Sequence, residues 1–135
     1  MSVLASLLLA QSAAAIAPPA LPTFDAPPSE AVAREIVVIG RKMKVWKGGI
    51  YKKGDRLACR IKVSSKDKDV DAIRCGAMLR CFAPEEAEFD RIAALDVPTK
   101  ERNRMMQAHA ESLTPCLDAA HEAGMRYLAE SRARK

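Results

Sequence analysis

The sequence predicts an α+β fold, in which a small antiparallel strand meander at about residues 35–63 is packed by three or four C-terminal helices and held by two disulfides. Three observations support this prediction. Residues 35–63 contain a β-branched run, an alternating apolar segment and a turn sequence. Residues 70–128 repeat apolar side chains at helical spacing. The chain also carries four cysteines, an even number that can pair completely.

The strands are predicted from two patterns. Residues 35–39, Glu-Ile-Val-Val-Ile, form a β-branched run that favours a buried strand. In residues 57–63 apolar side chains alternate with polar ones, which is typical of a strand with one buried face. Between them Gly48-Gly49 is expected to break the first strand, and Lys53-Gly54-Asp55 is a turn signal. A sheet this small needs helices over its apolar face.

The helices that cover it are predicted from the apolar periodicity and from proline. The first covers residues 70–82. Pro84 starts a second and Thr99 caps a third, while Thr114-Pro115 marks either a kink or the start of the last helix. We expect these helices to form the layer that buries the meander.

The N-terminal quarter of the chain predicts export. Residues 1–17 are apolar and rich in alanine, as in a signal peptide, although a buried helix is the alternative. Residues 18–33 are rich in proline and alanine and predict a linker in which only Leu21 and Phe24 can pack. Residues 34–135 are then a single domain. No later segment is apolar and long enough to span a membrane, so the mature protein is expected to be periplasmic or secreted, without a transmembrane segment.

The cysteines predict structural disulfides. On one helix Cys75 and Cys81 would lie about 9 Å apart along the axis, too far to bridge. We therefore favour Cys59–Cys75 with Cys81–Cys116, and the crossed pairing stays open. No closely spaced pair suited to zinc and no C-x-x-C is present, so neither a metal, a cofactor nor a catalytic cysteine is predicted.

The charge is concentrated in the predicted meander. Residues 41–68 contain eleven basic and two acidic residues, whereas the rest of the chain contains 11 basic and 15 acidic residues. Such a surface, with two aromatic residues inside it, can hold a polyanion by charge and stacking. The alternative is that the lysines only keep edge strands from aggregating. The predicted binding residues are Lys42, Lys44, Trp46, Lys47, Tyr51, Lys52, Lys53, Arg60 and Lys62.

These patterns favour a small non-enzymatic module that binds an anionic envelope component or an acidic partner protein. Sequence-specific recognition of nucleic acid is not predicted, because none of its motifs is present. A small hydrolase is an alternative of another class. It would need a pocket that unites His109 and His121 with an acidic residue such as Glu122.

Residues 35–41, Glu-Ile-Val-Val-Ile-Gly-Arg, resemble the TonB box near the mature N-termini of TonB-dependent outer-membrane receptors. In that family the box pairs with the TonB protein as an added strand. The resemblance implies a periplasmic setting and, as a further alternative, an accessory or inhibitor protein that adds residues 36–39 to the sheet of a partner. It covers seven of 135 residues and does not imply receptor function, and an ordinary core strand explains the same residues.

Overall fold

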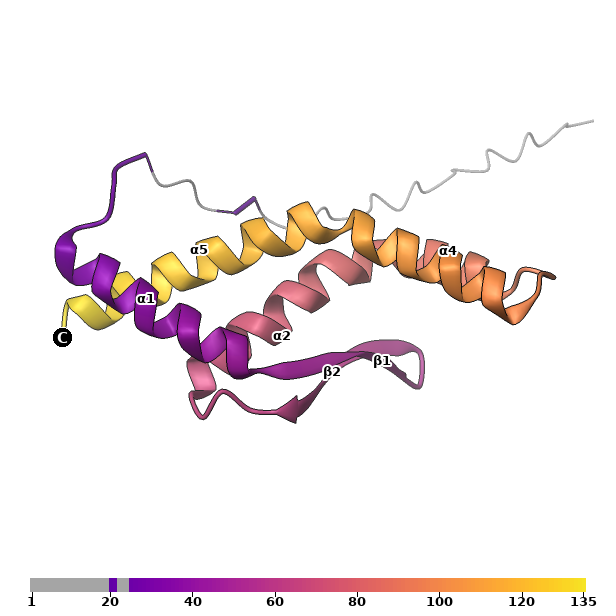
Figure 1. Ribbon diagram of the computed structural model, residues 1–135, viewed down its shortest axis with the longest axis horizontal. Helices are drawn as coiled ribbons and strands as arrows, with labels where there is room; N and C mark the ends of the chain where they lie inside the picture. The colour runs from indigo at the N-terminus through magenta and orange to yellow at the C-terminus, as the bar shows by residue number, and fades with distance from the viewer. Residues whose placement is uncertain (1–19, 22–24) are drawn as a thin grey trace, which may run out of the picture.

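The computed structural model describes residues 20, 21 and 25–135, so the predicted signal peptide and Phe24 lie outside the described residues. Within this range the chain forms five α-helices, one short 3-10 helix and a two-stranded antiparallel sheet (Figure 1). The predicted α+β class is therefore confirmed. The elements are α1 (Glu30–Val45), β1 (Lys47–Lys53), β2 (Arg56–Val63), α2 (Lys68–Phe82), η1 (Ala83–Glu85), α3 (Glu86–Ala93), α4 (Thr99–Ser112) and α5 (Thr114–Ala133).

The predicted first strand, residues 35–39, is wrong, because these residues lie in the middle of α1. This helix begins before the predicted domain boundary, at Glu30, where the N–H of Val32 donates to the side chain of Ser29 at 3.3 Å. Residues 30–33, predicted as linker, therefore belong to the helix. The segment that resembles a TonB box is helical too, so it presents no strand edge for pairing with another sheet.

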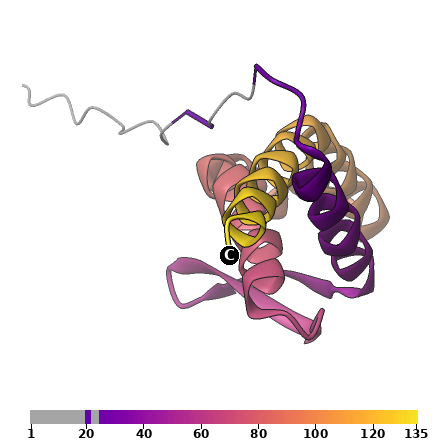
Figure 2. The same ribbon diagram turned by 90° about the vertical axis from the view of Figure 1, so that its left-hand side faces the viewer.

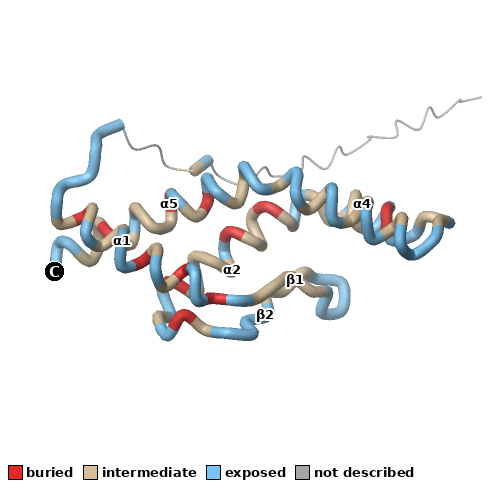
Figure 3. The backbone as a smooth tube through the Cα atoms, viewed as in Figure 1, coloured by how far each residue is buried: buried red, intermediate tan, exposed pale blue. Residues whose placement is uncertain are grey.

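The main hydrophobic core lies where α1, α2 and α5 meet. From α1 it takes Val32, Ile36, Ile39 and Met43, whose spacing of three or four residues places them on one helical face. Figures 2 and 3 show α1 beside α5, with buried residues gathered where the two helices meet α2. This shared face outweighs the strand preference of the β-branched run. The other members of the cluster are Val70, Ile73, Met125, Leu128 and Ala129.

The sheet is a hairpin whose strands are joined at Gly54, in the predicted turn. Gly54 has a φ of 66°, which favours glycine. β1 continues through Gly48-Gly49, where a break was expected. A Cβ on Gly48 would lie 2.5 Å from the Trp46 ring and 2.6 Å from the carbonyl oxygen of Arg60. Glycine at this position therefore lets the indole pack directly against the strand.

The helix α2 links the hairpin to the helical layer through both disulfides. Cys75 is bonded to Cys59 of β2 with a Cα separation of 5.6 Å, and Cys81 is bonded to Cys116 of α5 with a Cα separation of 5.9 Å. The favoured pairing is therefore confirmed. Beside the second bridge Leu21 packs against a smaller apolar cluster of α2 and α5, as expected for this residue of the linker.

Four helices follow the sheet, in agreement with the predicted three or four. Pro84 lies in η1 and leads into α3. Thr99 is the first residue of α4, but the N-cap position is Pro98 and no side chain caps the helix, so the predicted cap at Thr99 is wrong. Thr114 starts α5, so Thr114-Pro115 marks a new helix, which follows α4 along one side of the molecule (Figure 1). No helix in the described part of the chain combines the length and the apolar character needed to cross a membrane.

Candidate anion-binding surface

The two faces of the hairpin differ chemically. Because Cys59 is bonded to Cys75 of α2, its side of the sheet faces the helices. Directly paired residues of an antiparallel sheet lie on the same side, so this inner face also holds Ile50, the partner of Cys59, and the Lys52–Leu57 pair. The alternate residues project away from α2, toward solvent.

The outer face gathers most of the exposed charge of the hairpin. The register pairs Lys53 with Arg56 and Tyr51 with Ala58, and places Arg60 opposite a glycine. Lys62, two residues beyond Arg60, is exposed and lies at the register shift opposite Lys47 and Gly48, and we group it with these residues. We call Tyr51, Lys53, Arg56, Arg60 and Lys62 the basic outer face. Arg56 was missed by the sequence prediction, although its position directly across the turn from Lys53 could have indicated it.

The cations of this face have no anionic partner among residues 20, 21 and 25–135. Within the described part of the chain, none of Lys53, Arg56, Arg60 and Lys62 forms an ion pair. Arg60 instead lies over the ring of Tyr51, with its guanidinium carbon 4.4 Å from the ring centroid. At about 3.4 Å per residue, the row from Arg56 to Lys62 extends for roughly 20 Å. An external anion along this row would relieve the repulsion between its charges.

Two of the predicted binding lysines are engaged elsewhere. The Nζ of Lys42, on α1, lies 2.8 Å from a carboxylate oxygen of Asp67. The Nζ of Lys52 lies on the inner face, 3.0 Å from carboxylate oxygens of both Glu86 and Asp90. Hydrogen bonds to Asp90 and then to Glu86 raise the pKa of Lys52. The structure therefore separates both lysines from the basic outer face.

Trp46 is also separated from the basic outer face. Its side chain is buried, with 3% of the residue exposed, and the guanidinium carbon of Arg74 lies 4.8 Å from the ring centroid. The predicted stacking role of Trp46 is corrected accordingly, since the ring packs inside the protein. Lys44 and Lys47 are exposed and lie at the junction between α1 and β1, beside the indole in sequence.

The two histidines have different neighbours. The Nε2 of His109 lies 3.1 Å from a carboxylate oxygen of Glu85, and its ring meets Phe89 edge-on at a centroid distance of 4.7 Å. His121 lies beside Arg74, with a shortest nitrogen separation of 3.3 Å. Burial, followed by the charge of Arg74, lowers the pKa of His121. The two imidazoles share no hydrogen-bonding partner among the residues described here.

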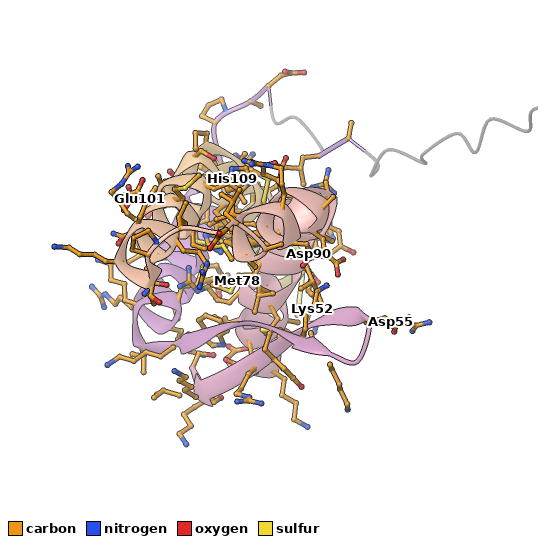
Figure 4. The ribbon with its side chains drawn as sticks, turned by 90° about the vertical axis from the view of Figure 1, so that its right-hand side faces the viewer. Lys52, Asp55, Met78, Asp90, Glu101 and His109 are labelled. Atoms are coloured by element: carbon orange, nitrogen blue, oxygen red, sulfur yellow. A yellow bond between two sulfur atoms is a disulfide. The ribbon has the colours of Figure 1, made fainter. Side chains whose placement is uncertain are left out.

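Across residues 20, 21 and 25–135, no group of three or more histidine, cysteine, aspartate or glutamate side chains is placed to hold a metal ion. Asp55, the one carboxylate of the turn, lies at the tip of the hairpin (Figure 4). The basic outer face is thus the most concentrated charged feature of the hairpin.

No protein-family model, curated protein or solved structure matches this chain. The chemistry of the basic outer face is therefore the basis on which a function can be inferred.

Proposed function

We propose that the protein is an exported, non-enzymatic binding module that docks through its basic outer face on an anionic bilayer surface of the cell envelope. One contrast supports this proposal most directly. Lys42 and Lys52 are paired with carboxylates of their own chain, whereas Lys53, Arg56 and Lys62 face solvent without a carboxylate partner in the described range. Fixed cations on a flat sheet suit a surface of anionic head groups.

Exposed apolar residues beside the basic outer face favour a bilayer over an acidic protein or polysaccharide. Val63 pairs with Lys47 at the start of β1, and Val45 ends the preceding helix. The exposed fractions are 54% for Val45 and 41% for Val63. Basic residues next to exposed aliphatic ones are typical of surfaces that rest in the head-group region. Tyr51 adds an amphipathic ring on the outer face.

The disulfides support a periplasmic or secreted location. Disulfides persist in oxidising compartments and are rare in the reducing cytosol. Here all four cysteines are paired, in bridges that tie the hairpin to α2 and α2 to α5. In such a compartment the anionic head groups of the envelope are accessible to the basic outer face.

Charge reversal tests the proposal. The variant carries Lys53→Glu, Arg56→Glu, Arg60→Glu and Lys62→Glu, and binding is measured by sedimentation with vesicles of zwitterionic lipid containing increasing fractions of phosphatidylglycerol. Each basic residue near an anionic membrane contributes about 1 kcal/mol, so loss of all four should weaken binding by roughly 10³-fold. Binding of the unmodified protein should also weaken steeply as salt is raised.

The matched control has the same change in net charge at positions outside the hairpin. Its binding should fall several-fold at most, because only the overall attraction is reduced. Equal losses in the two variants, or no binding of the unmodified protein to anionic vesicles, would overturn the proposal. Retention on a heparin-like polysaccharide without retention on vesicles would identify a different polyanion and would also reject the bilayer. The control substitutions are Arg41→Glu, Lys100→Glu, Arg134→Glu and Lys135→Glu, all at exposed positions.

A further inference from the structure

A cleft of about 480 Å³ opens between the inner face of the hairpin and the helices. Its volume lies within the range of small-molecule sites. Its hairpin side is formed by the inner residues Ile50, Lys52 and Leu57 together with Gly49 and Tyr51, whereas the four cations of the basic outer face do not line it. Its lining is mainly apolar and comes from four parts of the fold, with Ile50 and Leu57 from the hairpin, Met78 and Phe82 from α2, Phe89 and Ala93 from α3, and Met106 from α4.

The lining suits an apolar group of moderate size. Phe82 and Phe89 stack with their ring centroids 5.5 Å apart, so they present a continuous aromatic wall. Met78 and Met106 supply flexible side chains that adapt to irregular shapes. Burial of an alkyl or aryl group here is favoured because it removes apolar surface from water.

The charged residues of the cleft carry a net negative charge. The ammonium of Lys52 lies 3.0 Å from carboxylate oxygens of both Glu86 and Asp90, so one cation faces two anions. Figure 4 shows Lys52 and Asp90 close together, with Met78 nearby. The Asp90 side chain is 57% exposed, so its carboxylate remains accessible to a second cation.

We propose that this cleft binds a hydrophobic amine, a molecule with an alkyl or aryl body and one ammonium group. The body would lie against Phe82, Phe89 and Met78, and the ammonium would pair with Glu86 and Asp90 beside Lys52. A ligand with the same body and a carboxylate would meet two like charges and only one ammonium, which is already engaged. The cleft therefore selects for positive charge, in contrast to the basic outer face, and the two sites take ligands of opposite sign.

Three probes that share one apolar body test this inference. They are 4-phenylbutylamine, 4-phenylbutanol and 4-phenylbutyrate, titrated into the oxidised protein labelled with ¹³C at the methionine methyl groups. Met78 and Met106 line the cleft, whereas Met43 and Met125 belong to the core between α1 and α5 and serve as internal references. The amine should shift the Met78 and Met106 signals saturably, with a Kd of about 1 mM for a ligand of this size. The carboxylate should bind at least tenfold more weakly.

Two sets of variants separate the role of charge from that of shape. Glu86→Gln combined with Asp90→Asn should weaken the amine at least fivefold and leave the affinity for the alcohol nearly unchanged. Ala93→Phe should fill the cleft and abolish binding of all three probes. Ala87→Phe, at an exposed α3 position outside the lining, should leave binding of the probes unchanged. A carboxylate that binds as tightly as the amine would overturn the inference. So would the lack of any saturable shift at Met78 and Met106.

Discussion

A single carboxylate, that of Asp67, joins three helices. Its side chain caps α2 by accepting hydrogen bonds from the backbone N–H groups of Asp69 and Val70. It also accepts from the Nζ of Lys42, on α1, at 2.8 Å and from the guanidinium of Arg132, on α5, at 2.9 Å. Only 8% of its side chain is exposed. Asp67 therefore fixes the corner at which the helices around the main core meet.

Asp67→Asn should lower the free energy of unfolding by about 2–4 kcal/mol at neutral pH. Asparagine caps a helix as well as aspartate does, so the loss reports on Lys42, which is left without its anion, and on Arg132, which keeps only Asp69 at 3.2 Å. The hydrogen bond from Arg132, then that from Lys42, holds the pKa of Asp67 well below its ordinary value of 3.8. A lowered pKa stabilises the fold above that ordinary value, and this contribution is lost as the pH falls further.

Urea denaturation from pH 7 down to pH 2 measures both effects. The gap in stability between the unmodified protein and Asp67→Asn should be constant above about pH 5 and shrink below about pH 4. Asp96→Asn, at an exposed position, is the control and should change stability by less than about 0.5 kcal/mol. A gap that does not depend on pH would show that the carboxylate charge of Asp67 is not the stabilising feature.

At the scale of the elements, α1 shows where local sequence is insufficient. Residues 35–39 contain four β-branched or aliphatic side chains in succession, and this pattern alone favours a strand. The helix forms because Ile36, Ile39 and Met43 together meet α5 and α2, and Ser29 supplies the cap. Distant segments provide that surface, so the choice between strand and helix depends on contacts that a local window does not contain.

The hairpin, too, was predictable from sequence only in part. The turn and the alternation of β2 were predictable because both are local patterns, and the same reasoning indicated a basic surface. The path of β1 through Gly48-Gly49 could not be predicted in this way, since Gly48 accommodates the Trp46 ring and the backbone of Arg60. Which lysines form ion pairs also depends on residues distant in sequence, because Asp67 pairs with Lys42, and Glu86 and Asp90 pair with Lys52.

Alanine substitutions at three positions of α1 distinguish its helix from the strand expected from sequence. On a strand Val37 and Ile39 would share a face, whereas on the helix Ile36 and Ile39 do. Ile39 is fully buried, Ile36 packs against the core and Val37 is 53% exposed. Ile39→Ala should therefore cost about 2–4 kcal/mol and Ile36→Ala at least 1 kcal/mol, while Val37→Ala should change stability by less than about 0.5 kcal/mol. Thermal unfolding followed by circular dichroism ranks the three. A large loss of stability in Val37→Ala together with no loss in Ile36→Ala would contradict the helix and support the strand.

For the molecule as a whole, α2 is the element that both disulfides join to other parts of the fold. It packs against the hairpin through Cys75 and against α5 through Cys81, and these two cysteines point in different directions because six positions on a helix differ by about 120°. The bridges close loops with sequence separations of 16 and 35 residues. In the chain-entropy account these loops correspond to about 3 and about 4 kcal/mol of stability. A domain of this size has a total stability of roughly 5–15 kcal/mol, so the bridges are a large part of it.

The two bridges should fail in different ways when each is replaced by a pair of serines. A two-stranded sheet is marginal without support, so loss of Cys59–Cys75 should loosen the hairpin while the helical core stays folded. Trp46, the single tryptophan, is buried against Gly48 and Arg74 and reports on this region. Its fluorescence should shift to the red at a temperature well below the loss of helix in Cys59→Ser/Cys75→Ser. In Cys81→Ser/Cys116→Ser both signals should change together, with Tm lowered by about 15–30 °C.

Removal of both bridges should leave a chain that is unfolded at 37 °C, because the combined loss of about 7 kcal/mol approaches the stability available to so small a core. Reduction of the unmodified protein should reproduce that state, and its reversal on reoxidation is the control for covalent damage. The fold would then depend on an oxidising compartment, as the proposed envelope function requires. A reduced protein that keeps its helical content, its buried Trp46 emission and a Tm within about 5 °C of the oxidised form would remove this link between stability and location.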